Sequence, residues 1–462
     1  MELLIKKYSV KVHGKNSNLI RIEQPDGTWG FRGEKGQLFD AIVKNTLDAP
    51  TVIHWHGLIL PNNQDGVPYV TQPPIPAKGS YHYRFKLVQA GTYWMHSHAD
   101  LQEQRFLSAP FIINDPNEHI ADKEVVMMIG DFSFKEPTVI LKDLRKSNRM
   151  PMNMSQGKMS MSSSMLKNSK SSQPDLVDVH YDAFLTNYRT LQNPEIIPVK
   201  EGEKVRLRII AGSAMTNFFI HTGQLNAEAI AVDGERIKPI LGNQFQLAVG
   251  QRIDLLVTIP KGEGTYPILA QGEGTNMRTG LILATENAKI VLPNEKIATK
   301  AGALNYDQEF KTTALHPLSP QKPGQTLTVT LDGSMATYTW QINKQSWPIV
   351  NPIEVKPNKR IEMVFVNNTG MEHPMHLHGH VFEVTEIDGK PLKQGAMRDT
   401  VLVMPKSTVK IQFDTNNPGN WMMHCHMLYH QATGMMTFIN YDGVDVPSLK
   451  GLQEGGSGQK MN

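Results

Sequence analysis

The sequence predicts an all-β protein built from three β-sandwich domains, and three observations lead to that prediction. Short runs rich in β-branched and aromatic residues alternate with Gly, Pro and Asn turns, a pattern typical of antiparallel sandwiches. No long stretch shows helical periodicity. The chain has 462 residues, and this length predicts about three domains of roughly 150 residues each.

The clearest candidate strands combine β-branched or aromatic content with flanking turn residues. They are residues 125–129 (VVMMI), 205–210 (VRLRII), 361–366 (IEMVFV) and 408–413 (TVKIQF). Two stretches of turn-forming and charged residues, 113–124 and 292–325, indicate linkers. We therefore expect three domains, over residues 1–117, 118–291 and 292–462.

Composition argues against several classes of function. The net charge of +3 is too small over this length to indicate nucleic acid or an anionic membrane as a partner. No apolar run approaches the roughly 18 residues that a transmembrane helix needs, so we expect no membrane insertion. A single cysteine excludes an internal disulfide.

Histidines recur at a spacing of two residues far more often than chance allows. With 17 His in 462 residues, random placement gives roughly 0.6 His-x-His pairs, whereas the chain has five. In extended backbone, residues i and i+2 point to the same face, so each pair aims two imidazoles at one place. Four pairs supply eight imidazoles, which a cluster of three metal ions can account for and one ion cannot. These pairs are His54 with His56, His96 with His98, His376 with His378, and His424 with His426.

The only cysteine, Cys425, lies between the two histidines of the last pair. In extended backbone its thiolate points away from both imidazoles, so one tripeptide would join a metal on one face to the cluster on the other. A thiolate, two imidazoles and a weak thioether form the ligand set of a blue copper centre. The expected partners of Cys425 in such a site are His373, His430 and Met435.

These motifs resemble those of the multicopper oxidases, which include bacterial three-domain laccases and cuprous oxidases. All four copper motifs of the family occur in order, as HWHG, HSH, HPMHLHGH and HCHMLYHQATGM. The resemblance implies three cupredoxin-like Greek-key domains that hold four copper ions, one of type 1, one of type 2 and two of type 3. It also implies four one-electron oxidations coupled to reduction of dioxygen to water.

Carried over by position, the resemblance gives each ligand a role. His373, Cys425, His430 and Met435 would hold the type-1 copper, and His54 and His376 the type-2 copper. The type-3 pair would take His56, His96, His98, His378, His424 and His426. The first and third domains then carry all the ligands, so the cluster must lie at their interface, and metal binding should lock the two ends of the chain together.

Other histidines have ordinary explanations. We expect structural or surface roles for His13, His82, His119, His180, His221 and His316, and a supporting role beside the ligands for His380. A zinc hydrolase is a rival interpretation, but it explains neither the cysteine and methionine nor the number of imidazoles. An electron carrier would leave the eight paired histidines unexplained, and a nitrite reductase does not need four such pairs. A copper-binding or storage protein whose metal ions never turn over stays an alternative.

The electron donor is expected to be Cu(I), a phenolic or aromatic small molecule, or both. A Met-rich insertion at 150–172 lies among polar residues that cannot build a core, and soft thioethers suit Cu(I). Its methionines are Met150, Met152, Met154, Met159, Met161 and Met165. Met371 and Glu372, directly before His373, could add a thioether and a carboxylate for substrate copper, or Met371 could equally pack locally while Glu372 is solvated.

Reduction of dioxygen also needs protons. Asp65 matches in position an acid that the family has near the cluster, although an ordinary Asp-Gly turn explains it equally well. Some bacterial relatives have a second acid directly after the type-1 histidine, where this chain has Gln431. We therefore expect Asp65 to carry more of the proton relay.

The sequence gives less direct evidence about the cellular location of the protein. Lys6 and Lys7 interrupt the apolar N-terminal stretch, so it is not a signal peptide. From resemblance to exported family members we expect a periplasmic or secreted protein whose leader is absent from this chain, and we favour a monomer.

Overall fold

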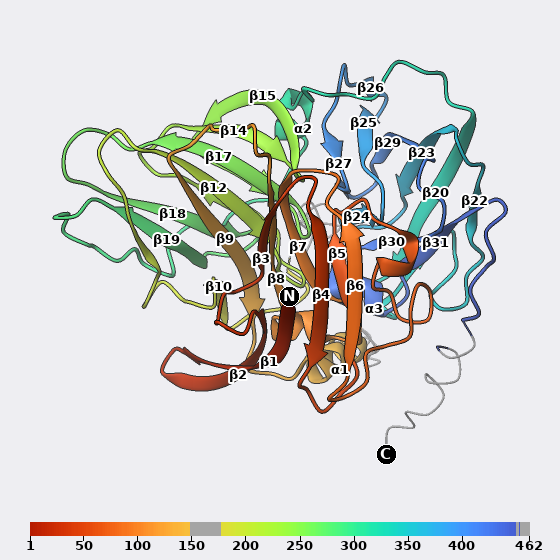
Figure 1. Ribbon diagram of the computed structural model, residues 1–462, viewed down its shortest axis with the longest axis horizontal. Helices are drawn as coiled ribbons and strands as arrows, with labels where there is room; N and C mark the ends of the chain where they lie inside the picture. Colours follow the sequence, from red (N-terminus) through yellow and green to blue (C-terminus); the bar gives the residue numbers. More distant parts are fainter. Residues whose placement is uncertain (148–176, 450–451, 453–462) are drawn as a thin grey trace, which may run out of the picture.

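The computed structural model describes residues 1–147, 177–449 and 452. Six sheets form three successive β-sandwiches, which confirms the predicted all-β fold class (Figure 1). The four candidate strands are also confirmed, because they lie inside β9 (Lys123–Phe132), β12 (Lys204–Ala211), β23 (Arg360–Asn367) and β29 (Thr408–Asp414). The Met-rich segment 150–172 lies outside the described residues.

The first sandwich contains two four-stranded sheets. The sheet of order β2-β1-β4-β6 contains β1 (Glu2–Val12), β2 (Lys15–Glu23), β4 (Leu38–Asn45) and β6 (Ser80–Lys86). The sheet of order β3-β8-β7-β5 contains β3 (Phe31–Glu34), β5 (Ile53–His56), β7 (Gly91–Ser97) and β8 (Ser108–Asn114). Two 3-10 turns, η1 (Asn62–Gln64) and η2 (Gln102–Arg105), follow β5 and β7.

The second sandwich has its own apolar core and carries none of the paired histidines. Its six-stranded sheet, of order β10-β9-β12-β17-β14-β15, contains β9 (Lys123–Phe132), β10 (Ala183–Thr186), β12 (Lys204–Ala211), β14 (Ala227–Val232), β15 (Glu235–Gly242) and β17 (Arg252–Thr258). Its five-stranded sheet, of order β11-β19-β18-β13-β16, contains β11 (Ile196–Pro198), β13 (Phe218–His221), β16 (Gln244–Leu247), β18 (Thr265–Gly272) and β19 (Arg278–Ala284).

The third sandwich completes the fold. One sheet, of order β21-β20-β23-β29-β25-β26 with β27 paired to β25, contains β20 (Gln325–Ser334), β21 (Thr339–Ile342), β23 (Arg360–Asn367), β25 (Phe382–Ile387), β26 (Lys390–Pro391), β27 (Met397–Arg398) and β29 (Thr408–Asp414). The other, of order β22-β31-β30-β24-β28, contains β22 (Ile353–Val355), β24 (His373–Leu377), β28 (Thr400–Val403), β30 (Asn420–Cys425) and β31 (Met436–Tyr441).

Three α-helices occur in the described residues: α1 (Pro137–Ser147), α2 (Asp307–Lys311) and α3 (Leu428–Ala432). The sequence interpretation found no helical periodicity and so missed α1. Its signal is short: Pro137 opens the helix, where a missing N–H costs nothing, and Ile140 and Leu144 bury one face at i, i+4 spacing. Among the described residues, no helix is long and apolar enough to cross a bilayer.

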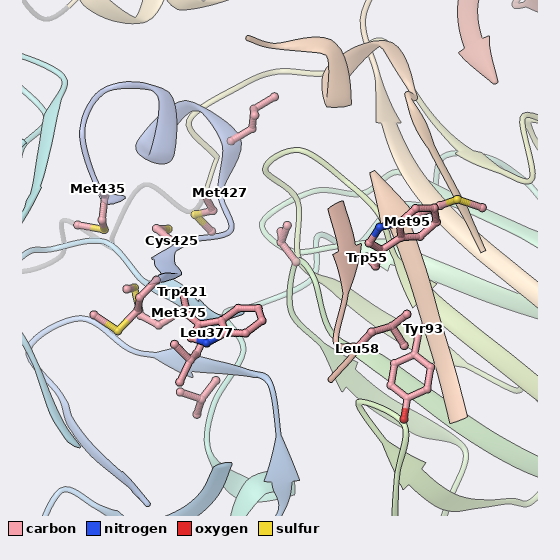
Figure 2. Close-up of a cluster of buried hydrophobic side chains, with 14 of the residues drawn as sticks. Trp55, Leu58, Tyr93, Met95, Met375, Leu377, Trp421, Cys425, Met427 and Met435 are labelled. Carbon is pink, nitrogen blue, oxygen red and sulfur yellow. The ribbon is translucent and has the colours of Figure 1, made fainter. Parts of the chain in front are cut away.

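The hydrophobic core of the first sandwich continues into that of the third. In Figure 2, Trp55 and Met95 lie on the strands of the first sandwich, and Trp421 and Met375 lie on those of the third. The second sandwich has a separate core. Because burial of this shared apolar surface holds the first and third sandwiches together, side chains at their boundary are fixed relative to one another.

Candidate metal centre

Paired strands aim the eight clustered histidines across the boundary between the first and third sandwiches. In the first, β5 runs antiparallel to β7 with His54 opposite His96. In the third, β24 runs antiparallel to β30 with His376 opposite His424. The other member of each pair is two residues further on and therefore faces the same way. Figure 1 shows β5 beside β24 and β30.

The imidazole nitrogens meet closely across this boundary. His54 Nε2 lies 3.5 Å from His376 Nε2, and His56 Nδ1 lies 3.2 Å from His426 Nε2. Four sets of three imidazoles have ligand atoms within 4.8 Å of one another. These sets are His54, His56 and His376; His54, His98 and His378; His56, His96 and His426; and His376, His378 and His424.

Burial lowers the pKa of seven of these imidazoles and so favours the neutral form that metal ligands need: His56, His96, His98, His376, His378, His424 and His426. Desolvation, followed by the proximity of the other imidazoles, holds the pKa of His96 and His98 well below the usual value, and the same two causes contribute at the remaining shifted members of the cluster. The Nε2 atoms of His96 and His98 are buried and have no hydrogen-bond partner in the described part of the chain. Neutral nitrogens crowded together without proton donors fit a group of borderline-soft metal ions such as copper.

Two buried aspartates hold imidazoles from both sandwiches. Asp65 accepts from His378 Nδ1 at 2.9 Å, and its other carboxylate oxygen is 3.2 Å from His54 Nδ1. Asp399 lies 3.0 Å from His56 Nε2, and its backbone carbonyl accepts from His376 Nδ1 at 2.8 Å. These contacts fix which nitrogen of each ring faces the metal space.

Arg252, from the second sandwich, keeps Asp399 ionised. Its guanidinium donates to both carboxylate oxygens, at 2.8 and 2.5 Å, and all these groups are buried. Burial alone raises the pKa of Asp399, but the adjacent Arg252 outweighs it and lowers the pKa well below the usual range. The second sandwich thus contributes a charge to the cluster without contributing a ligand.

A second site lies on the opposite side of β30. Cys425 Sγ is 3.6 Å from His373 Nδ1 and 3.8 Å from His430 Nδ1, and the two Nδ1 atoms are 3.2 Å apart. All three residues are fully buried, as is Met435. Figure 2 shows Met427 and Met435 near Cys425. Burial raises the pKa of the Cys425 thiol, so a bound cation is needed to favour the thiolate ligand.

The side chains around this site orient the two histidines. His430 Nε2 donates to Asp178 at 3.0 Å, and His373 Nε2 lies 2.8 Å from Thr369 Oγ1. The Trp340 ring packs against His430 with centroids 4.2 Å apart. With each Nε2 engaged, each Nδ1 faces Cys425, which is the arrangement that three-ligand binding of copper requires.

A cavity of about 530 Å³ reaches the edge of this site. Asp178 lines it, together with Met215, Asn217, Glu273 and Met277 of the second sandwich. The carboxylate of Asp178 is 2 % exposed, and its Oδ1 atom has no hydrogen-bond partner in the described residues. The cavity therefore approaches His430 through a single buried carboxylate.

Other residues singled out in the sequence have varied surroundings. Glu372 is buried and accepts from Asn217, which also donates to Glu273, whereas Met371 is half-buried. Burial, reinforced by Glu273, raises the pKa of Glu372 well above its usual value. Gln431 Nε2 is 3.5 Å from His98 Nδ1. The six Met-rich residues from Met150 to Met165 lie outside the described residues.

The remaining histidines are away from the ligand groups. His13 contacts Glu295 and His82 contacts Asp40, while His119, His180 and His316 are exposed and His221 is half-buried. His380 is buried, donates to the His378 carbonyl at 2.9 Å and contacts Tyr441. It therefore supports the backbone of the ligand strand.

Sequence reasoning missed Asp178, Asp399, Arg252 and a buried glutamate, Glu103. None stands in a histidine motif, and Asp178, Asp399 and Arg252 reach the sites only through folding of separate segments. Glu103 follows His98 by five residues, a spacing that carries no signal of its own in an irregular segment.

Comparisons with known proteins agree with this geometry. Three multicopper oxidase sequence profiles match residues 30–118, 123–290 and 319–443. Multicopper oxidase MmcO of Mycobacterium tuberculosis is 33 % identical over 416 residues, which cover 89 % of this chain and 81 % of that protein. Copper resistance protein A of Escherichia coli is 26 % identical over 538 residues, covering 89 % and 87 %. Laccase-1 of Thanatephorus cucumeris is 27 % identical over 500 residues, covering 87 % and 83 %.

Solved structures share the fold. Fet3p, a multicopper oxidase that functions in iron import, superposes with a TM-score of 0.77 at 19 % identity, covering 96 % of this chain and 90 % of its own. The laccase from Botrytis aclada gives 0.77 at 22 % identity, covering 95 % and 86 %. The profile matches over all three sandwiches, and the relative with 33 % identity, establish that the chain belongs to the multicopper oxidase family.

Proposed function

We propose that this oxidase uses four copper ions in two sites joined by the tripeptide His424–Cys425–His426. When bound, copper supplies one-electron redox chemistry at the cysteine site and the reduction of dioxygen to water at the cluster. The observation that carries the proposal is the geometry of Cys425, which faces His373 and His430 while its two neighbours face the cluster imidazoles.

The proposed distribution of ligands follows the family pattern. Cys425, His373 and His430, with Met435 as a weak axial ligand, would hold the type-1 copper, and His54 and His376 the type-2 copper. The type-3 pair would take the other six cluster histidines, His56, His96, His98, His378, His424 and His426. Asp65, which contacts two of the cluster histidines, is the proposed proton relay.

Cu(I) is the proposed donor. The cavity beside His430 has two thioethers, Met215 and Met277, and two carboxyl groups, Asp178 and Glu273, in its wall. Thioethers hold Cu(I), and an unpartnered carboxylate oxygen offsets its charge. Two further observations add support. Copper resistance protein A is among the relatives, and residue 177 in the cavity wall follows the Met-rich segment 150–172 closely in sequence.

A phenol is the second candidate donor, because laccases are also among the relatives and Asp178 could accept a phenolic proton as an electron leaves. Steady-state oxygen uptake with Cu(I) and with a dimethoxyphenol separates the two. The comparison uses the intact chain and a variant in which 150–172 is replaced by a Gly/Ser linker of equal length.

We expect the intact protein to prefer Cu(I), and the linker variant to lose part of the Cu(I) rate while its phenol rate is unchanged. The variant Met277→Leu, which removes a thioether at nearly constant volume, should lower the ratio of Cu(I) to phenol rates in the same direction. Equal phenol and Cu(I) rates that neither variant alters would favour a laccase.

A further inference from the structure

Three buried carboxyl groups surround the histidine cluster, and each contacts one imidazole from the first sandwich and one from the third. Asp65 contacts His54 and His378, and Asp399 contacts His56 and His376. Glu103 repeats this pattern, because it contacts His96 of the first sandwich and His426 of the third. The two remaining cluster histidines are His98 and His424, and here the neutral amide of Gln431 lies beside His98.

Glu103 is built into this position. Its side chain is 2 % exposed, and its Oε2 atom lies 3.1 Å from His96 Nδ1. Its Oε1 atom lies 3.9 Å from His426 Nδ1, and both of these buried atoms lack any hydrogen-bond partner in the described part of the chain. Glu103 Oε1 is an acceptor and His426 Nδ1 can donate, so a small approach of the two atoms would form a hydrogen bond between them.

The neighbouring segment explains why Glu103 is held there. It lies on η2, and the next residue, Gln104, donates to the Asp131 backbone carbonyl at 3.0 Å and accepts from Tyr181 at 2.8 Å. Asp131 in turn accepts from the backbone N–H groups of Ala214 and Met215. The glutamate is therefore fixed by contacts with the second sandwich as well as the first.

We infer that Glu103 is a positioning residue for the type-3 site: it holds the Nδ1 atoms of His96 and His426 so that both Nε2 atoms face the same copper ion. The inference rests on the proposed ligand distribution. His426 Nε2 already lies 3.2 Å from His56 Nδ1, and these three imidazoles form one of the close ligand sets. Losing an acceptor beside a metal-bound histidine lowers metal affinity by about 10- to 100-fold in known sites.

Glu103→Gln tests the inference, because the amide keeps the size of the side chain but has only one oxygen for two N–H donors. The matched control is Glu23→Gln, which removes a buried carboxylate paired with Lys6 and Arg21 in the same sandwich, away from the histidines. Three quantities are measured for each protein: copper bound per chain against a competing chelator, the Cu(II) electron paramagnetic resonance spectrum, and the thermal midpoint with and without copper.

We expect the blue absorption of Glu103→Gln, and its thermal midpoint without copper, to be close to those of the control variant. Its cluster copper should bind about 10- to 100-fold more weakly, and copper from the magnetically coupled pair should become visible in the resonance spectrum. Cluster binding equal to that of the control would overturn the inference. So would a fall in thermal midpoint that is equally large without copper, since that marks a purely structural role.

Failure of the proposed function has a different signature. If the unaltered chain itself binds no copper beyond the cysteine site, the ligand distribution is wrong whatever the variant does. If the unaltered chain fills the cluster and Glu103→Gln fills it equally well, only the role of Glu103 is wrong.

Discussion

The thiol of Cys425 lies at the boundary between the two groups of histidines. Its Sγ faces His373 and His430, whereas the imidazoles of the residues before and after it contact cluster histidines. This opposition follows from the alternation of side chains along β30. In the proposed assignment, this covalent link would give electrons a short path from one copper site to the other.

Replacing Cys425 with Ser should abolish the blue absorption and the oxidase activity while the cluster stays metallated, because a hydroxyl cannot supply the soft thiolate ligand. Visible absorption, oxygen uptake and copper content measure the three effects. Met435→Leu is the control, since loss of a weak axial ligand should shift the potential and leave the blue colour. Survival of the colour in Cys425→Ser would contradict the type-1 assignment.

Gln431 has a neutral amide directly after His430 in the sequence. Its Nε2 atom is 3.5 Å from His98 Nδ1 and 3.6 Å from Met436 Sδ, so a carboxylate there would lie beside the half-buried His98. Gln431→Glu should raise turnover where protonation is limiting, because it adds a titrating group near the cluster. Turnover measured across pH is the test, and an unchanged rate and profile would count against Asp65 carrying an extra share of the relay.

At the scale of elements, motif histidines were predictable because strand alternation converts spacing directly into direction. His54 and His56 need only an extended β5 to face one side. The supporting groups were not predictable: Asp178 and Asp399 reach His430 and His56 from segments far apart in the sequence, and Glu103 reaches His96 from the irregular turn that follows β7. Only tertiary packing brings these groups to their histidines, and no spacing in the sequence predicts the contacts.

Gly57, directly after β5 in the HWHG motif, shows how tightly an element end fits the cluster. Its φ is +87°, and a Cβ there would lie 2.5 Å from atoms of both Arg252 and Asp399. Gly57→Ala should therefore destabilise the protein by about 2–4 kcal/mol, from left-handed strain together with overpacking. Gly27→Ala is the matched control, because Gly27 has φ +89° and open space around it. Chemical unfolding of copper-free protein measures both, and equal losses would show that the crowding has no energetic effect.

At the scale of the molecule, the clustered histidines come from the first and third sandwiches, while the second supplies Arg252 and Asp178. Copper removal should loosen that boundary, since a ligand that binds only the folded state at 100 times its dissociation constant adds about 2.7 kcal/mol of stability. Hydrogen exchange should speed up in β5, β7, β24 and β30 and stay unchanged in β13 and β18 of the second sandwich. A uniform change in all six strands would contradict this division.

Glu235, at the start of β15, makes stability depend on pH at the junction of the three sandwiches. It is half-buried in a cavity of about 240 Å³ that Lys35 of the first sandwich also lines. Burial, and then repulsion by Asp399, raises its pKa to about 7, although Lys35 and Arg252 act in the opposite direction. The folded protein therefore binds this proton more tightly than the unfolded chain, in which a glutamate titrates near pH ~4.3.

Stability from the protonated Glu235 is fully present below about pH 4.3 and is lost as the pH rises through about 7. Glu235→Gln removes the titration, so its free energy of unfolding relative to the unaltered chain should rise between pH 4.5 and pH 8 by roughly 1–3 kcal/mol. Denaturant titrations of copper-free protein at each pH measure the difference, with Glu201→Gln, an exposed glutamate of the same sandwich, as control. Parallel pH curves for all three proteins would show that Glu235 ionises as easily in the folded state as in the unfolded one.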